Sequence, residues 1–386
     1  MQIVEVTNER LSKDFLLCPV RLYKNDPNYI RPLDKDVNAV FNPEQNKSFR
    51  HGKAMRWLLR DDQGQNIGRI AAFANRRYKN KGDMQPTGCF GFFDCINDQA
   101  AANQLLDTAK DWLKAEGFEA MDGPVNFGER DKFWGLLVEG FTPVPYGMNY
   151  NAPYYKELLE NYGCQVFYYQ NCYSREVMPR LPEKFYVAHE RFEKQPGFSA
   201  KHVSKKNLEK FAEDFCTVYN KAWASHEGNK EMSKQQALKM FTLMKPVMDE
   251  RLAWFAYHNN EPVAMYVSLP DLNQIFRHLD GQFHLWAKLK FLFYKWKGEM
   301  TNMTGIVFGV VPEFQGTGID YFMVVEAAKI IQHQTPYRYT ELQWQGDFNP
   351  KMNNISLNLG FSLTRRLATY RYLFDRNQEF RRHPIF

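Results

Sequence analysis

The stretch Gly309-Val-Val-Pro-Glu-Phe-Gln-Gly-Thr-Gly-Ile-Asp320 determines the fold predicted for the second half of this chain. It follows the apolar segment 304–310 and precedes apolar residues that recur at helical spacing from Ile319 to Ile331. Glycines at 316 and 318 permit backbone conformations that are closed to residues with a Cβ. The N–H groups of such a turn can converge with those of a helix's first turn, which predicts a phosphate or diphosphate site. An ordinary strand-to-helix turn is the alternative.

Two better-known phosphate-binding patterns are excluded. The stretch has no Gly-Lys-Ser/Thr, as a P-loop requires, and it lacks the three-glycine spacing of a Rossmann fold. It resembles instead the hallmark of the GNAT acyltransferase superfamily: Val-x-Pro-Glu, an aromatic residue, and Arg or Gln-x-x-Gly-x-Gly/Ala before a helix. The matching residues are Val310, Pro312, Glu313, Phe314, Gln315 and Gly318, whereas Asp320 departs from the family's Gly or Ala.

A second signature of that family, N-x-x-A-x-x-L-Y-x-x-x-G-F, has its counterpart between Asn349 and Phe361. Asn349 and the pair Gly360-Phe361 are in register, and Ser356 stands where the family usually has Tyr. The two motifs lie in the expected order, so the resemblance covers 198–374. Over 1–175 it depends only on a repeated order of elements.

That repeat indicates a diverged duplication. A strand, a polar turn and a second strand are predicted at 55–73 and again at 252–269, and a further strand and helix follow at 89–113 and 304–331. The predicted fold class is α/β (α+β), with two tandem GNAT-like domains, each a mixed, mostly antiparallel sheet flanked by helices. We expect a first domain at 1–180, a linker or crossover at 181–197 and a second domain at 198–386. Three prolines and dense charge make 176–197 a poor helix or central strand.

The resemblance implies an acyl-CoA-dependent N-acyltransferase, first of all an acetyltransferase, that transfers an acyl group directly to an amine. The co-substrate is then acetyl-CoA or another acyl-CoA. By position, Val310 and Val311 would give main-chain contacts to the pantetheine arm. The other cofactor-binding candidates are Gln315, Gly316, Thr317, Gly318, Ile319, Asp320 and Asn349. The carboxylate of Asp320 would repel a diphosphate, so we expect it to point away and to complement the helix dipole.

The family's general acid is the Tyr that Ser356 replaces, and a serine hydroxyl has too high a pKa for the task. Ser356, Tyr321 and Tyr370 are candidate acids, and water is a further one. Candidate bases near the end of a predicted strand are Asp347, Glu341 and Gln345. The substitutions Asp320 and Ser356 also keep open a non-catalytic acyl-CoA-binding or regulatory protein.

The first half shows no pyrophosphate loop. No glycine follows the strand at 89–95, acidic residues stand where phosphates would dock, and Asn97 or Asp98 is a simple helix cap. We therefore interpret 1–180 as a degenerate GNAT-like domain. Its aromatic-rich segment 121–151 is either a turn-rich scaffold or a wall of the acceptor cleft, with five possible contacts: Asn126, Arg130, Trp134, Tyr146 and Asn149.

The segment 284–297 mixes large apolar residues with lysines. It predicts an inserted helix that covers apolar surface with its lysines in water, and a membrane-surface helix or a lid over a long acyl chain are the alternatives. The inserted helix is the interpretation we favour.

Composition sets the remaining limits. The chain has 386 residues, 44% hydrophobic and 24% charged, which is typical of a globular protein. No signal peptide or CxxC pair is visible, so the six cysteines predict reduced thiols and a cytoplasmic location. The histidines show no metal-ligand spacing.

The net charge of +6 suits an anionic ligand, but the positive and negative charges are interspersed along the chain, so no nucleic-acid partner is expected. The acceptor, a small-molecule or peptide amine, stays open among an amino acid, a peptide, a polyamine, an aminoglycan and an amino-lipid, and so does the length of the acyl chain. The oligomeric state is also open.

Overall fold

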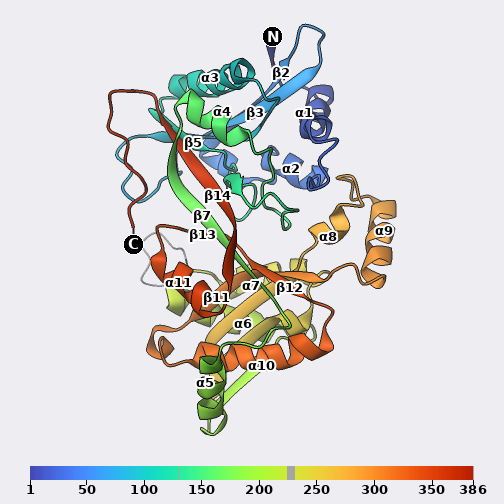
Figure 1. Ribbon diagram of the computed structural model, residues 1–386, viewed down its shortest axis with the longest axis vertical. Coiled ribbons are helices and arrows are strands. Elements are labelled where there is room, and N and C mark those ends of the chain that lie inside the picture. Colours follow the sequence, from blue (N-terminus) through green and yellow to red (C-terminus); the bar gives the residue numbers. More distant parts are fainter. Residues whose placement is uncertain (129, 224–230, 386) are drawn as a thin grey trace.

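The computed structural model of the protein describes residues 1–128, 130–223 and 231–385. Within these residues fourteen strands form one sheet that runs through both halves of the chain (Figure 1). The helices lie on the faces and at the ends of this sheet. Each predicted half is therefore a mixed sheet flanked by helices, but the two sheets are continuous.

The first half contributes seven strands. Its elements are β1 (Gln2–Glu5), α1 (Glu9–Leu22), α2 (Asp34–Val40), η1 (Lys47–Arg50), β2 (Gly52–Arg60), β3 (Asn66–Asn75), β4 (Thr87–Cys95), α3 (Gln99–Ala115), β5 (Ala120–Gly123), β6 (Leu136–Glu139), α4 (Tyr155–Tyr162) and β7 (Gln165–Glu176). Asp98 caps α3, as one of the two candidates predicted, by accepting a hydrogen bond from the N–H of Ala101 at 2.7 Å.

The second half repeats this order with one insertion. Its elements are α5 (Glu183–Glu193), β8 (Phe198–His202), α6 (Leu208–Trp223), α7 (Lys234–Met244), η2 (Glu250–Leu252), β9 (Ala253–His258), β10 (Glu261–Pro270), α8 (Asn273–Phe276), α9 (Leu285–Trp296), β11 (Asn302–Val310), η3 (Pro312–Phe314), α10 (Ile319–Gln334), β12 (Tyr339–Leu342), β13 (Gln345–Gly346), α11 (Pro350–Asn358) and β14 (Ser362–Leu373).

The strand order shows the duplication directly. From one edge it is β1-β2-β3-β4-β5-β14, and from the other β8-β9-β10-β11-β12-β7, with β14 and β7 paired in the middle. Each half therefore gives its last long strand to the other: β14 pairs with β5, and β7 pairs with β12. The boundaries at 180 and 198 stay a prediction, but neither half has a complete sheet without a strand from the other.

The expectation that 176–197 is a poor helix is wrong. Helix α5 occupies Glu183–Glu193 of this segment and packs against α10 (Figure 1). Pro179 and Pro182 both precede the first helical turn, where a missing N–H costs no hydrogen bond, and Pro196 follows the last turn. Proline content alone therefore predicted the wrong structure, because the positions of the prolines matter.

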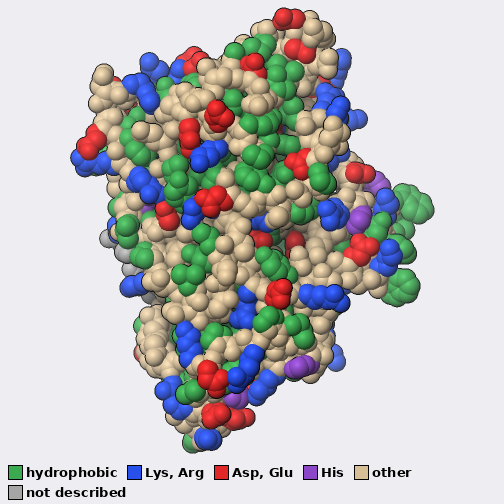
Figure 2. Space-filling view, viewed as in Figure 1, with side chains coloured by type: hydrophobic (Ala, Val, Ile, Leu, Met, Phe, Trp, Pro, Cys, Tyr) green, Lys and Arg blue, Asp and Glu red, His purple; other side chains and the backbone are tan. Residues whose placement is uncertain are grey.

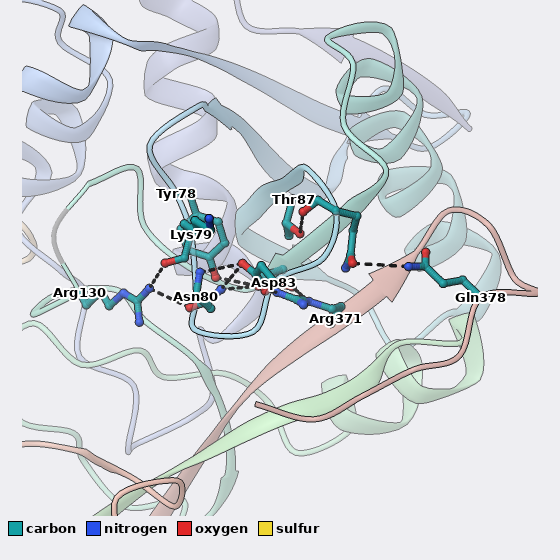
Figure 3. A network of polar contacts seen from close by, with 10 residues as sticks. Tyr78, Lys79, Asn80, Asp83, Thr87, Arg130, Arg371 and Gln378 are labelled. Atoms are coloured by element: carbon teal, nitrogen blue, oxygen red, sulfur yellow. Dashed lines mark hydrogen bonds and ion pairs between the residues drawn. The ribbon is translucent and has the colours of Figure 1, made fainter. Parts of the chain in front are cut away.

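A buried polar network fastens β14 to the first half (Figure 3). Arg371 of β14 donates to both carboxylate oxygens of Asp122 on β5, at 2.6 and 2.8 Å, and pairs with Asp83 at 2.8 Å. Tyr78 and Asn80 also donate to Asp122, at 2.8 and 3.2 Å. Since Asp122 is fully buried, its charge depends on these partners.

Candidate functional site

The sheet opens at the end of β11. Strands β11 and β12 pair in parallel only from Asn302 to Gly305, although β11 continues to Val310. After β12 the chain turns to pair with β7 as β13. On its other side β11 pairs with β10, and a β-bulge in β11 leaves Ile306 without a partner residue on β10; Ile306 is 40% exposed. The β12-facing edge of β11 beyond Gly305 is thus left without a neighbouring strand, and an extended ligand could pair with it.

A cavity of about 590 Å³ lies in this opening, which is ample for a small-molecule ligand. Its walls are mainly apolar. They come from β11, β12, α10 and α11, and include Val307, Leu342, Val324, Ala328, Met352 and Ile355. Within the described chain, two buried polar atoms on the lining have no hydrogen-bond partner: Thr340 Oγ1 and Gln345 Oε1. Buried polar atoms are rarely left unpaired, so both indicate contacts to a ligand.

Ser356 lines this cavity and is almost completely buried. Its Oγ accepts a hydrogen bond from Gln345 Nε2 at 2.7 Å, which leaves the hydroxyl proton available for another acceptor. Helix α11 begins at Pro350, where its N-cap Asn349 accepts the N–H of Met352 at 3.3 Å, and Gly360 follows its end with φ +78°. Asn349, a cofactor-binding candidate, also lines the cavity.

The loop after β11 has the predicted glycine geometry. Gly316 and Gly318 have φ of +73° and +88°, which a residue with a Cβ rarely adopts. Several loop amides are already engaged, since Gln315 and Thr317 donate to carbonyls of η3 and Ile319 donates to Thr317 Oγ1. In the described residues the N–H groups of Gly316 and Gly318 have no such partner.

Asp320 lies at the start of α10, but its carboxylate faces the helix. Burial, the largest cause, raises the pKa of this carboxylate, and the backbone N–H groups of Asp320 and Tyr321 at the start of α10 oppose that rise. The carboxylate therefore lies close to two amides that were expected to face a diphosphate. Arg191 of α5 donates to the carbonyl of Thr317, and Lys184 also acts on Asp320, so cations surround this corner.

The other sequence candidates lie apart from the cavity. Tyr321 packs on Phe185 with ring centroids 4.3 Å apart. Tyr370 is buried in the first half and donates to Glu160 at 3.0 Å. Asp347 accepts the N–H of Tyr169 at 3.1 Å and pairs with Arg382 at 2.6 Å. Their catalytic roles stay predictions.

The main-chain candidates Val310 and Val311 lie at the end of β11. The carbonyl of Val310 accepts from Gln315 Nε2 at 3.1 Å. The N–H of Val311 donates to Val263 at 2.9 Å, on the β10 side. The predicted pantetheine contact of Val311 would therefore have to use its other backbone group.

A second cavity, of about 330 Å³, lies between the halves. It contains a buried ion pair, in which Arg365 Nε donates to Glu341 at 2.8 Å. Asp271 lies beside this pair and accepts the N–H groups of Tyr146 and Asn273, each at 3.1 Å. Desolvation, reinforced by the charge of Glu341, raises the pKa of Asp271 to about 6. Sequence reasoning missed Asp271, because no motif marks it.

Most of the predicted acceptor wall is engaged in structural contacts. Arg130 donates to Asn80 at 2.8 Å (Figure 3), Trp134 to Tyr168 at 2.8 Å, and Asn149 to the carbonyl of Gly135 at 2.7 Å. Asn126 accepts the N–H of Phe127, and Tyr146 donates to Asp36 at 2.6 Å. These contacts favour the scaffold interpretation for those five residues, whereas residues 142–145 of the same segment line the second cavity.

The corresponding opening of the first half is filled. Strands β4 and β5 diverge, as β11 and β12 do; β4 and β5 pair over three residues before they separate. Aromatic rings fill the space between β4 and β5, among them Phe73, Phe92, Phe127 and Phe133. The cavity beside them measures about 60 Å³. The difference in size agrees with the degenerate loop in the sequence.

No family model matches the chain. The bacterial ceramide synthase of Caulobacter vibrioides is 26% identical over 369 residues, covering 93% of this chain and 94% of that protein. Protein YghO of Escherichia coli is 26% identical over 384 residues, covering 94% and 93%. A solved tandem GNAT protein from the clavulanic acid biosynthesis pathway superposes with a TM-score of 0.53 at 10% identity, over 97% of this chain and 98% of that one. The tandem GNAT fold predicted from the two motifs is thus confirmed.

Proposed function

We propose that this tandem GNAT-fold protein transfers a long acyl chain from a thioester of coenzyme A to the amine of a lipid-like acceptor, forming an amide. The observation that carries the proposal is the large, mainly apolar cavity where β11 and β12 separate. An acetyl group would leave most of that wall exposed to water. A long acyl chain would cover it, at about 0.8 kcal/mol for each buried methylene.

The chemistry needs a polar centre at one end of that apolar wall. The amine nitrogen attacks the thioester carbonyl carbon and gives up one proton, the C–S bond breaks, and the leaving thiolate takes up a proton, so the products are an amide and a free thiol. Ser356 has a hydroxyl proton free to donate a hydrogen bond to the leaving sulfur, which water then protonates, and Gln345 fixes its oxygen. The unpaired Gln345 Oε1 suits the N–H of the attacking amine.

The acceptor class is suggested by the name of one relative. A ceramide is the amide of a fatty acid and a long-chain amino alcohol, and the C. vibrioides protein named for its synthesis aligns over nearly the whole of both chains. In this chain, Asp271 of the second cavity suits an ammonium group, whereas Glu341 beside it is already paired with Arg365. Met303 lines both cavities, which places the two sites next to each other.

A non-catalytic acyl-thioester-binding protein is the alternative. The carboxylate of Asp320 at the loop amides favours it, because this group weakens the expected diphosphate contact. The release of free thiol in the presence of a long-chain amine separates the two functions. An acyltransferase would release thiol steadily, whereas a non-catalytic binding protein would release no more than one equivalent of thiol per protein.

Thiol release with a series of donors from acetyl-CoA to palmitoyl-CoA tests the proposal. We expect kcat/KM to rise about fourfold per methylene until the cavity is full. Ala328→Trp narrows the cavity and should shift the preferred chain to a shorter one. Ala100→Trp, at an exposed position of α3, is the matched control. Equal kcat/KM for acetyl-CoA and palmitoyl-CoA would contradict the proposal.

A further inference from the structure

Helix α9 carries an exposed apolar surface that no other element covers among the described residues. The described residues include fifteen exposed large hydrophobic side chains. Six of them lie on this helix of twelve residues: Leu285, Trp286, Leu289, Leu292, Phe293 and Trp296. Trp286 and Trp296 are 73% and 83% exposed. We call these six residues the α9 face. Such a concentration is unusual for a surface helix and indicates a binding partner.

The other side of α9 is firmly attached to the protein. Ala287 and Phe291 are buried against Ile275 and Phe276 of α8. At the end of α8, His278 stacks on Tyr294 with ring centroids 4.0 Å apart, and its Nε2 contacts Glu299 at 2.9 Å. The expectation that α9 is an inserted helix covering apolar surface is therefore fulfilled by its inner side only, because the α9 face covers nothing.

Lysines border the α9 face on both sides. At about 100° per residue, the six apolar side chains span an arc of about 120°. On the same projection Lys288 and Lys295 lie along one border, and Lys290 and Lys297 along the other. All four are exposed, and α9 itself contains no acidic residue. Only Lys297 has an acidic neighbour, Glu299, at 3.5 Å.

We propose that the α9 face docks the protein on an anionic lipid bilayer, with its aromatic and leucine side chains in the headgroup–acyl boundary and the four lysines at lipid phosphates. Trp, Phe and Leu on one side with lysines at its borders is the arrangement of interfacial helices. Long lysine stems can lie along the apolar face while their ammonium groups stay in water.

The shape and the charge favour a bilayer over a protein partner. Figure 2 shows apolar side chains standing out from the outline of the molecule where α9 lies, so the surface is convex. A fluid bilayer accepts protruding side chains, whereas a protein would need a matching pocket. Lysine is also depleted in protein–protein interfaces. Among the described helices none is both long and apolar enough to cross a bilayer, so the contact proposed is peripheral.

Docking through the α9 face would also hold the second cavity near the membrane. The short helix α8 lies between α9 and this cavity: Ile275 and Phe276 pack toward α9, whereas Gln274 and Arg277 line the cavity. The docking proposal does not depend on acyl transfer, since it is argued from exposure, shape and charge alone.

Co-sedimentation with vesicles tests the docking. The full chain should bind vesicles of phosphatidylcholine with phosphatidylglycerol and bind phosphatidylcholine alone much more weakly. The triple variant Trp286→Ser, Phe293→Ser, Trp296→Ser should lose binding to both. Its matched control replaces three exposed apolar residues elsewhere: Met84→Ser, Val187→Ser and Leu243→Ser. The control should bind as the wild type does.

The lysines are tested separately. Neutralising Lys288, Lys290 and Lys295 to Gln should weaken binding to the anionic vesicles about a hundredfold, at about fivefold per lysine. The same change at the exposed Lys24, Lys114 and Lys239 is the control. Failure of the wild type to bind anionic vesicles, or equal binding by the serine variant, would overturn the proposal. A wild type that is dimeric in light scattering, together with a serine variant that is monomeric, would also overturn the proposal, because the α9 face would then bind a second copy of the chain.

Discussion

Replacing Asp271 by Asn should stabilise the protein at neutral pH. The carboxylate is buried beside Glu341, and desolvation is the largest cause of its raised pKa of about 6. The N–H groups of Tyr146 and Asn273 donate to Oδ1, which asparagine also provides. The substitution therefore removes a costly charge and keeps both hydrogen bonds.

The sign and size follow from proton linkage. Between pH 3.8 and about 6 the unfolded chain has lost this proton while the folded protein still holds it, so stability falls as pH rises through that window. At about 1.4 kcal/mol per tenfold change in proton affinity, the charged carboxylate costs about 3 kcal/mol at pH 7. Below the window the proton is bound in both states and the cost disappears.

Urea unfolding followed by tryptophan fluorescence measures this effect. The free energy of unfolding of Asp271→Asn should exceed that of the wild type by about 3 kcal/mol at neutral pH, and the excess should vanish near pH 4. Asp61→Asn is the control, since Asp61 also accepts two backbone N–H groups but lies in a surface turn. An excess that does not change with pH would refute the reasoning.

The remaining predictions concern the buried network, the loop and the cavity. Arg371→Met leaves the fully buried Asp122 without its main cation and should lower the free energy of unfolding by about 3–5 kcal/mol. Adding Asp122→Asn should restore at least half of that loss. No recovery of stability in the double variant would contradict the ion-pair account. Asp320→Asn should lower KM for an acyl-CoA and leave KM for the matching acyl-pantetheine unchanged, whereas an equal effect on both donors would mean that the diphosphate does not lie at this loop. Ser356→Ala removes the hydrogen bond proposed to the leaving thiolate and should lower kcat for thiol release about ten- to a hundredfold with little change in KM; an unchanged kcat would mean that Ser356 does not contact the sulfur.

Local sequence was enough for the parts of this protein that depend on backbone conformation. Gly316 and Gly318 predicted a left-handed turn, and both have positive φ. Asp98 predicted a helix cap, which the structure contains. Two motifs in register, with the repeated order of elements, predicted the fold. The first describes a strand–turn–helix unit and the second a helix and the turn into β14, and both depend on contacts that are short in sequence.

Contacts between distant segments were beyond such patterns. The exchange of β7 and β14 joins residues about two hundred positions apart, and no periodicity encodes a partner strand. The position of the Asp320 carboxylate relative to a diphosphate stays a prediction, since a carboxylate at a first helical turn can face solvent or the amides of that turn. Asp271 was invisible because its raised pKa comes from burial and from Glu341, which lies seventy residues away.

The amino-acid sequence alone determined the tandem fold, the turn after β11 and the mixture of apolar and basic residues in α9. Only the tertiary structure decided which faces those residues present. It left the α9 face exposed, opened the apolar cavity between β11 and β12, and filled the equivalent opening of the first half with aromatic rings. The physical reason is that burial is a property of the assembled chain, whereas turn geometry and helical spacing are properties of neighbours in sequence.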